Sequence, residues 1–394
     1  MINRRTLLLG SASLAAGSVL TSCRSSAANT LDVTLLEGAI PVEVLQAFRK
    51  QMPTPVNFQT QIQMQGVFQQ LQRWQQPRED KSWSRFLPWR SEETQARPHQ
   101  LVSLGDYWLK GAIAANLIEP LSLSTEQRSP LPSQWQQFVT RDQSGQITAS
   151  DLLWAAPYKV QSLVILYRQS GNQPNFSQWS DLLDPRLKGQ IALPNHPGLV
   201  IGLLQKMQTG SFNTSFESLV NSSASTLQLV EQLSEALAEP FAALNRQVKT
   251  YDSQTALKAL ANEDVKAIVI WSGDVVTALQ RYRSLRAVMP EEGSLLSADM
   301  WVKPKGAPMT DAAQSWIDFC WQPEVASQLS LSGGGLSPIF LGQPADDSSE
   351  FPETLKTHRL SPIAMANSEP LLPLPDSMQA AYFELWKQLR TKTA

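Results

Sequence analysis

The sequence has no large excess of positive or negative charge, and it contains few cysteines. After residue 22 it also has no long apolar run. Its 33 basic and 35 acidic residues give a formal charge of −2 over 394 residues. Nucleic-acid binding requires a basic patch or stripe, so this balance argues against a polyanionic partner. Because no second apolar run is present, we expect no membrane-spanning segment in the rest of the chain.

Familiar catalytic motifs are also missing. The three histidines, His99, His196 and His358, are far apart, and the sequence contains neither Gly-x-Ser-x-Gly nor His-Glu-x-x-His. A membrane-tethered hydrolase would need a nucleophile with a base, a metal triad or paired carboxylates of separated pKa. The sequence gives little support for such a site. We therefore predict a protein that is not an enzyme and uses no metal or cofactor.

The first 22 residues have the pattern of an export signal. Arg4 and Arg5 precede an apolar run from Leu7 to Leu20, which is shorter than the ~20 residues that span a membrane. The Leu-Thr-Ser sequence that ends the run lies directly before Cys23 and is typical of a lipoprotein signal. The paired arginines are compatible with the twin-arginine route as well as the general secretory route, so both stay open.

Lipidation would take place at Cys23, whose thiol accepts a diacylglyceryl group before a peptidase cleaves in front of it. Residues 23–30 would then form the tether of a lipid-anchored protein on the periplasmic side of a bacterial membrane. Cys320 is left as a single thiol and cannot form an internal disulfide. Its apolar neighbours place it in the core face of a helix.

The length and the repeated pattern of the mature chain predict two α/β lobes. Removing the first 22 of 394 residues leaves 372, which suits two lobes of roughly 150 to 200 residues. Apolar segments with strand character recur and are followed by turns and helical patterns, which favours sheets covered by helices on both faces. The strand segments are Leu31–Leu36, His99–Leu104, Ser162–Tyr167, Gln190–Leu193 and Lys266–Trp271.

Two further segments have a simpler interpretation. Residues 75–98 are rich in Gln, Arg, Pro and acidic side chains without a clear period, which indicates an exposed insertion. Gly333, Gly334 and Gly335 are not followed by the Lys-Ser or Lys-Thr pair of a phosphate loop, so they indicate a turn.

Several segments, in order and with matching spacing, resemble the spermidine/putrescine-binding proteins, members of the bacterial extracellular solute-binding family that serves ABC importers. The segments that carry the likeness are Leu101–Leu121, Trp154–Tyr167, Trp179–Leu204, Ala267–Ala278 and Val288–Pro308. The most specific parts are Pro157-Tyr158, the Trp179–Pro185 segment, Ile270–Gly273 and Met289–Gly293.

The resemblance implies a two-lobed periplasmic-binding-protein fold, type II-like, with a ligand gripped in a hinged cleft. The expected domains are a signal peptide at 1–22, a tether at 23–30, a first lobe from 31–155 and 300–345, and a second lobe from 156–299 and 346–394. The chain would cross between the lobes near 154–157, near 299–302 and after Pro338. ABC permease subunits would be its partners, and a monomer is expected.

The resemblance also suggests ligand-binding residues at the carboxyl ends of strands, where the cleft of such sheets lies. Tyr107 and Trp271 match aromatic rings that flank the alkyl chain of a polyamine, and Asp299 matches a carboxylate that meets an ammonium group. The remaining candidates are Glu37, Asp106, Tyr158 and His196. Each also has a plainer interpretation, as a core aromatic, a helix cap or a solvated carboxylate.

Departures from the family pattern leave the solute open. Where the relatives carry two acidic residues, this chain has His196 and Leu199, and a tryptophan of the relatives is replaced by Ser297. We therefore expect a small polar or cationic solute other than spermidine. A ligand-sensing or scaffold lipoprotein with the same fold is the alternative.

Overall fold

The computed structural model describes residues 30–76, 97–148, 152–169, 174–213, 226–332, 334–341, 364, 366–372 and 376–392. The predicted signal peptide, Cys23, nearly all of the tether, and most of the expected insertion at 75–98 lie outside these residues.

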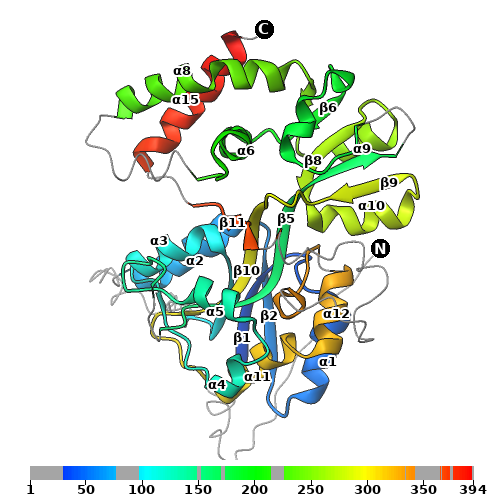
Figure 1. Ribbon diagram of the computed structural model, residues 1–394. Coiled ribbons are helices and arrows are strands. Elements are labelled where there is room, and N and C mark those ends of the chain that lie inside the picture. The colour runs from blue at the N-terminus through cyan, green and yellow to red at the C-terminus, as the bar shows by residue number, and fades with distance from the viewer. Residues whose placement is uncertain are drawn as a thin grey trace, which may run out of the picture.

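Two lobes lie one above the other and are joined by strands at a narrow waist (Figure 1). The lower lobe begins with β1 (Leu31–Leu36), α1 (Val42–Gln51), β2 (Val56–Gln61), α2 (Met64–Gln75), β3 (Leu101–Gly105), α3 (Asp106–Ala114), β4 (Ile118–Glu119), α4 (Thr125–Arg128) and α5 (Ser133–Val139). It is completed after the return of the chain by α11 (Asp311–Cys320), α12 (Pro323–Ser332) and the short η5 (Pro338–Phe340).

The upper lobe contains the middle of the chain and its last helix. Its elements are η2 (Trp179–Leu183), η3 (Pro185–Leu187), β6 (Ile191–Leu193), α6 (Pro197–Thr209), α8 (Thr226–Asn245), β7 (Val248–Tyr251), α9 (Ala256–Ala261), β8 (Ala267–Trp271), η4 (Ser272–Asp274), α10 (Val275–Arg281), β9 (Leu285–Val288) and α15 (Asp376–Lys392). In Figure 1 the C-terminal α15 lies against α8.

Three strands connect the lobes: β5 (Ala156–Arg168), β10 (Leu295–Pro304) and the short β11 (Glu369–Pro370). The sheet has the order β2-β1-β3-β10-β5-β8-β6-β7, with β4 and β11 paired to β10 and β9 paired to β5. Because β10 pairs antiparallel with both β3 and β5, one continuous mixed sheet runs from one lobe into the other.

Each lobe has its own hydrophobic interior. The core of the lower lobe contains Trp301 and Trp316, and it includes β5 as far as Val160. From Leu163 onward β5 belongs to the upper lobe, as does Leu295 at the start of β10. The chain therefore changes cores between residues 160 and 163 in β5 and between residues 295 and 296 in β10. The lobe limits expected from the sequence, 31–155 with 300–345 and 156–299 with 346–394, stay a prediction.

The α/β prediction is confirmed, while several predicted boundaries were wrong. β1 begins and ends at the residues expected from its apolar run. The expected strand at 99–104 is β3 at 101–105, and the helix that follows it ends at Ala114, because Asn116 adopts a left-handed φ of 55° and β4 follows. The predicted strand at 162–167 is the second half of β5, whose 13 residues pass through both lobes.

Candidate functional site

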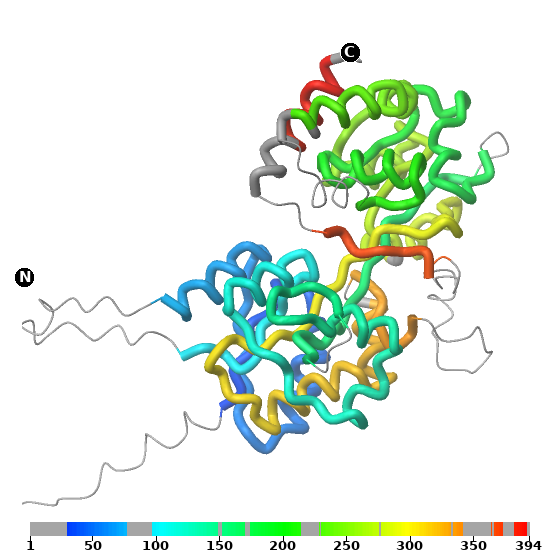
Figure 2. The backbone as a smooth tube through the Cα atoms, turned by 60° about the vertical axis from the view of Figure 1, so that its left-hand side comes forward, coloured from blue at the N-terminus to red at the C-terminus, as the bar shows by residue number. Residues whose placement is uncertain are grey.

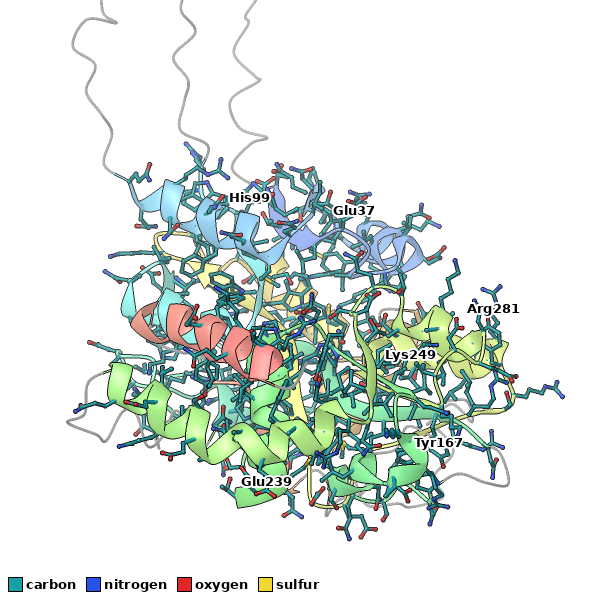
Figure 3. The ribbon with its side chains drawn as sticks, turned by 90° about the horizontal axis from the view of Figure 1, so that it is seen from above. Glu37, His99, Tyr167, Glu239, Lys249 and Arg281 are labelled. Carbon is teal, nitrogen blue, oxygen red and sulfur yellow. The ribbon has the colours of Figure 1, made fainter. Side chains whose placement is uncertain are left out.

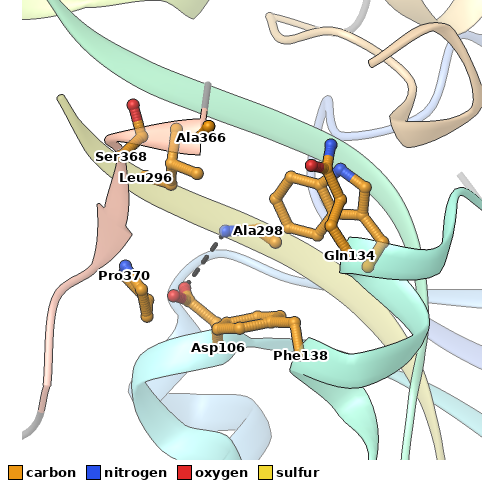
Figure 4. A pocket seen from close by; sticks show the side chains of 9 residues that line it. Asp106, Gln134, Phe138, Leu296, Ala298, Ala366, Ser368 and Pro370 are labelled. Atoms are coloured by element: carbon orange, nitrogen blue, oxygen red, sulfur yellow. Dashed lines mark hydrogen bonds between the residues drawn. The ribbon is translucent and has the colours of Figure 1, made fainter. Parts of the chain in front are cut away.

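A buried carboxylate lies where the lower lobe meets the connecting strands. β3 ends at Gly105, and Asp106 begins α3 with only 7% of its surface exposed. Its Oδ1 accepts hydrogen bonds from the hydroxyl of Ser297 at 3.2 Å and from the backbone N–H of Ala298 at 3.1 Å. Both donors belong to β10, so Asp106 holds the start of α3 against a strand that joins the two lobes (Figure 4).

The environment of Asp106 favours its neutral form. Burial raises the pKa of Asp106 to about 7, although the hydrogen bonds from Ala298 and Ser297 act in the opposite direction. The nearby charge of Asp299 raises the pKa further. The carboxyl group therefore changes its charge near neutral pH, which is a property found mainly at functional sites.

Two adjoining cavities lie beside Asp106. The first has a volume of about 170 Å³ and is lined by Asp106, Gln134, Trp135, Phe138, Leu296, Ala298, Ala366, Ser368 and Pro370 (Figure 4). The second, of about 200 Å³, is lined by Asp106, Lys110, Phe138, Arg141, Gln146, Ile147, Pro370, Leu371 and Leu372. They share Asp106, Phe138 and Pro370. Apolar walls with a few convergent polar groups are typical of ligand sites.

One wall of both cavities is formed by residues 366–372, which we call the strap. In Figure 2 the strap, coloured red to orange, runs across the waist between the lobes. Its Glu369 accepts hydrogen bonds from Ser211 Oγ at 2.9 Å, Phe212 N at 2.6 Å and Asn213 Nδ2 at 2.8 Å, all in the upper lobe. The strap is thus fixed to the upper lobe through Glu369, while its Ala366, Ser368 and Pro370 line the first cavity.

Close backbone packing adds to this attachment. Gly293 has a φ of 93°, and a Cβ atom there would lie 1.9 Å from the carbonyl oxygen of Asn367. Ser294 N donates to Ser368 Oγ at 2.8 Å, and the buried Lys206 donates to the carbonyl of Asn367 at 3.2 Å. Any change in the angle between the lobes must therefore move the strap relative to α3 and α5.

Asp299 is already paired with a cation. It lies on β10 opposite Lys159 of β5, and the Lys159 Nζ is 2.8 Å from Asp299 Oδ2. The two side chains are 10% and 16% exposed. Because Lys159 neutralises the carboxylate of Asp299, a cationic solute would have to displace the lysine or share the carboxylate with it.

The predicted aromatic residues are separated by the fold. Tyr158 is fully buried in the core of the lower lobe, stacks on Trp301 with ring centroids 4.4 Å apart, and shares a 2.8 Å hydrogen bond with Ser103. This position accounts for Tyr158 by packing, since no face of its ring is left for a solute. Tyr107 is half-buried on α3 with its ring edge-on to Trp108.

Trp271, His196 and Glu37 lie away from the Asp106 cavities. Trp271 ends β8, is half-buried and packs on the core of the upper lobe. His196 caps α6, its Nδ1 accepts from Leu199 N at 3.3 Å, and burial lowers the pKa of its imidazole. Glu37 is exposed after β1. Figure 3 shows Glu37 with His99 at the lower lobe, apart from Tyr167, Glu239, Lys249 and Arg281 of the upper lobe.

Sequence reasoning did not find Trp135, Phe138, Arg141 or the strap. The first three lie on or just after α5, in a segment that has no counterpart among the matched family motifs. An aromatic pair followed by an arginine was the available signal. Arg141 is 5% exposed and its guanidinium lies 5.2 Å from the centre of the Phe138 ring.

Over residues 30–392, apart from the gaps given above, no three His, Cys, Asp or Glu side chains gather as a metal site. Among the helices in those same ranges, none combines the length and apolar character needed to cross a bilayer.

A family model described as bacterial extracellular solute-binding protein matches residues 101–361, more than half of the chain. The chain belongs to this family. The predicted resemblance is therefore confirmed at the family level, and the match includes α3, α5, β10 and the residues of both Asp106 cavities up to the strap.

The curated relatives of this solute-binding protein match it over a shorter stretch. The spermidine/putrescine-binding periplasmic protein of Escherichia coli K12 is 23% identical over 188 residues, which make up 46% of this chain and 50% of that protein. The chain thus matches about half the length of these relatives.

Solved structures share the two-lobed fold over nearly the whole chain. The spermidine/putrescine ABC transporter substrate-binding protein PotD of Streptococcus pneumoniae has a TM-score of 0.70 at 17% identity, with 93% of this chain and 100% of that chain covered. The Tp0655 (TpPotD) lipoprotein of Treponema pallidum has a TM-score of 0.62 at 13% identity and covers 92% and 100%. At such identities the likeness establishes the fold alone.

Proposed function

We propose that this protein is the extracytoplasmic solute receptor of an ABC importer and captures a small polar or cationic solute between its lobes. The observation that carries the proposal is the pair of cavities at Asp106, which are closed on one side by a strap fixed to the opposite lobe. A solute held there contacts groups that move with both lobes. Binding would then favour one angle between them, which is how hinged receptors signal occupancy.

The proposed hinge consists of the three connections through β5, β10 and the strap. Lys159 and Asp299 tie β5 to β10 at the waist, and Asp106 ties β10 to α3. Rotation about these strands would change the distance from the strap to Phe138 and Arg141. Permease subunits would recognise the closed arrangement.

A lipid anchor at Cys23 is the second part of the proposal. It is supported by the signal sequence and by the description of the Treponema pallidum relative as a lipoprotein. Each buried methylene of an acyl chain contributes about 0.8 kcal/mol, so an acylated cysteine with more than one chain holds a protein at a membrane. Cys23→Ser is expected to release the protein from the membrane fraction and abolish its labelling by radioactive palmitate, while Cys320→Ser serves as the matched control.

The receptor role is tested by a thermal-shift screen of the chain from residue 24 onward, which retains every described residue. The panel contains polyamines, amino acids, quaternary amines, sugars and small organic anions. A solute at 100 times its Kd stabilises the folded state by about 2.7 kcal/mol. That corresponds to a rise in Tm of roughly 5–10 °C for a lobe of this size.

A saturable rise with one class of solute supports the receptor. If no class of solute raises the Tm of the folded protein, the alternative function as a sensor or scaffold is favoured, because such a protein needs its cleft only for a macromolecular partner.

A further inference from the structure

The two Asp106 cavities differ in the charged side chains that line them. Lys110 and Arg141 line the second cavity, and Asp106 is the one other charged side chain that lines it among the described residues. In the part of the chain that the structure describes, Asp106 is the one charged group lining the first cavity, together with the rings of Trp135 and Phe138. Asp106 lies where the cavities adjoin. A solute at this junction therefore meets the carboxyl group of Asp106, with aromatic rings on the side of the first cavity and two cations on the side of the second.

Aromatic faces and a buried carboxylate together suit an ammonium group. A cation over an indole or phenyl ring gains about 0.5–2 kcal/mol, and the carboxylate adds a charge-assisted hydrogen bond. The hydrogen bonds of Asp106 to Ser297 and Ala298 both go to Oδ1. The carboxylate is therefore held in place through Oδ1, and neither of these two hydrogen bonds uses Oδ2.

The cationic end suits a carboxylate. Arg141 Nη1 donates to the carbonyl of Gly145 at 3.0 Å, which fixes the guanidinium, and its Nε has no hydrogen-bond partner among the described residues. A buried donor without an acceptor costs about 1–3 kcal/mol. Burial also lowers the pKa of Arg141, while the charge of Asp106 acts against this effect. An anion near Arg141 would offset the cost of burying its charge.

The volumes limit the size of the solute. A cavity of about 150 Å³ holds a molecule the size of benzene. Cavities of about 170 and 200 Å³ therefore leave room for a short apolar body with one charged group at each end. Phe138 and Pro370, which line both cavities, would pack against that body.

We propose that the adjoining cavities bind a small zwitterion, with its ammonium group against Asp106 and its carboxylate toward Lys110 and Arg141. This inference rests on the proposed function as a solute receptor and names the chemical class of its solute. A polyamine would leave Lys110 and Arg141 facing a second ammonium group, whereas a dicarboxylate would place like charges together at Asp106. Asp299 does not provide a site for a second ammonium group, because it lines neither cavity and is already paired with Lys159.

Three four-carbon solutes with different ends test this directly: putrescine, γ-aminobutyrate and succinate. Titration calorimetry with the chain from residue 24 onward at pH 7 is expected to show γ-aminobutyrate binding at least tenfold more tightly than the other two. Tighter binding of putrescine or succinate overturns the zwitterion inference and leaves the receptor function standing. The inference alone also fails if none of the three binds while another solute class raises Tm in the wider panel. If no solute of any class binds, the receptor function fails with it.

Variants separate the two poles. Asp106→Asn keeps an oxygen for Ser297 and Ala298, so the fold is retained, and γ-aminobutyrate affinity should fall at least tenfold. Lys110→Gln should weaken γ-aminobutyrate and succinate but not putrescine. Glu43→Gln, on the exposed first turn of α1, is the control and should change none of the three affinities. Equal losses for all three solutes in the Asp106 and Lys110 variants would indicate a merely structural role and overturn the assignment.

Proton release gives a second readout. With a pKa of about 7, Asp106 is mostly protonated at pH 6; the other charged side chains around it are Lys110, Arg141 and Asp299, and Asp299 is paired with Lys159. An ammonium group favours the ionised carboxylate, so roughly one proton should leave on binding at pH 6. Calorimetry in two buffers of different ionisation enthalpy measures this release. Binding of γ-aminobutyrate without proton release would contradict contact with Asp106.

Discussion

Replacing Asp106 by asparagine should stabilise the protein at pH 8 and leave its stability nearly unchanged at pH 4. Asparagine keeps the Oδ1 acceptor for Ser297 and Ala298 but cannot ionise. In the native protein, burial raises the pKa of Asp106 from 3.8 to about 7, so folding favours its neutral form. The contribution of Asp106 to the free energy of unfolding is therefore highest below pH 3.8 and falls as the pH rises toward 7.

The size of this effect follows from the two pKa values. Between pH 3.8 and about 7 the native state binds a proton that the unfolded chain has lost. Each pH unit in this window costs about 1.4 kcal/mol, and the whole window about 4 kcal/mol. The asparagine variant avoids this cost, so at pH 8 its Tm should exceed that of the native protein by roughly 10 °C for a lobe of 150–250 residues.

Urea unfolding at pH 4, 6 and 8, followed by tryptophan fluorescence, measures the difference between native protein and variant. The exposed Glu43→Gln is the control and should show no pH-dependent difference. Stability of Asp106→Asn that is lower than native at pH 8, or a difference independent of pH, would refute the assignment of a neutral buried carboxyl.

Three other substitutions test the waist and the core. Tyr158→Phe removes one hydrogen bond to Ser103 and should cost about 1 kcal/mol without altering the affinity for any solute in calorimetry; a tenfold loss of affinity would restore its predicted ligand role. Lys159→Gln leaves the half-buried Asp299 without its cation, so we expect a loss of about 3 kcal/mol in the free energy of unfolding. Unchanged stability in urea unfolding would show that the pair does not hold the waist. Glu369→Ala removes three hydrogen bonds to the upper lobe. We expect it to lower the free energy of unfolding by about 3 kcal/mol and to speed hydrogen exchange of the strap. Unchanged exchange would show that other contacts hold the strap.

The strands that are buried on both faces could be predicted from the sequence. β1 and β8 consist of apolar runs with several β-branched residues, so their positions follow from burial alone. β2 received no assignment because it is an edge strand with the sequence VNFQTQ and alternating exposure. Its place depends on pairing with β1, which is a tertiary interaction that no local pattern records.

The candidate site was predictable only in part. Asp106 was named from its place after a strand, and the structure places it at the cavities. Tyr158 was named from a family motif, but that motif serves the packing of β5 on Trp301. The strap could not be found, because its contribution comes from hydrogen bonds to residues more than 150 positions away.

The central claim is that the two lobes close on a solute, and a distance between them measures this most directly. Spin labels can be attached in a Glu43→Cys, Lys258→Cys variant of the chain from residue 24 onward, since both positions are exposed and lie in different lobes. The remaining Cys320 is buried and should not react. We predict that the distribution of label distances shifts to shorter values when saturating solute is added. A distribution that stays the same with every solute that raises Tm would contradict closure of the lobes on a bound solute.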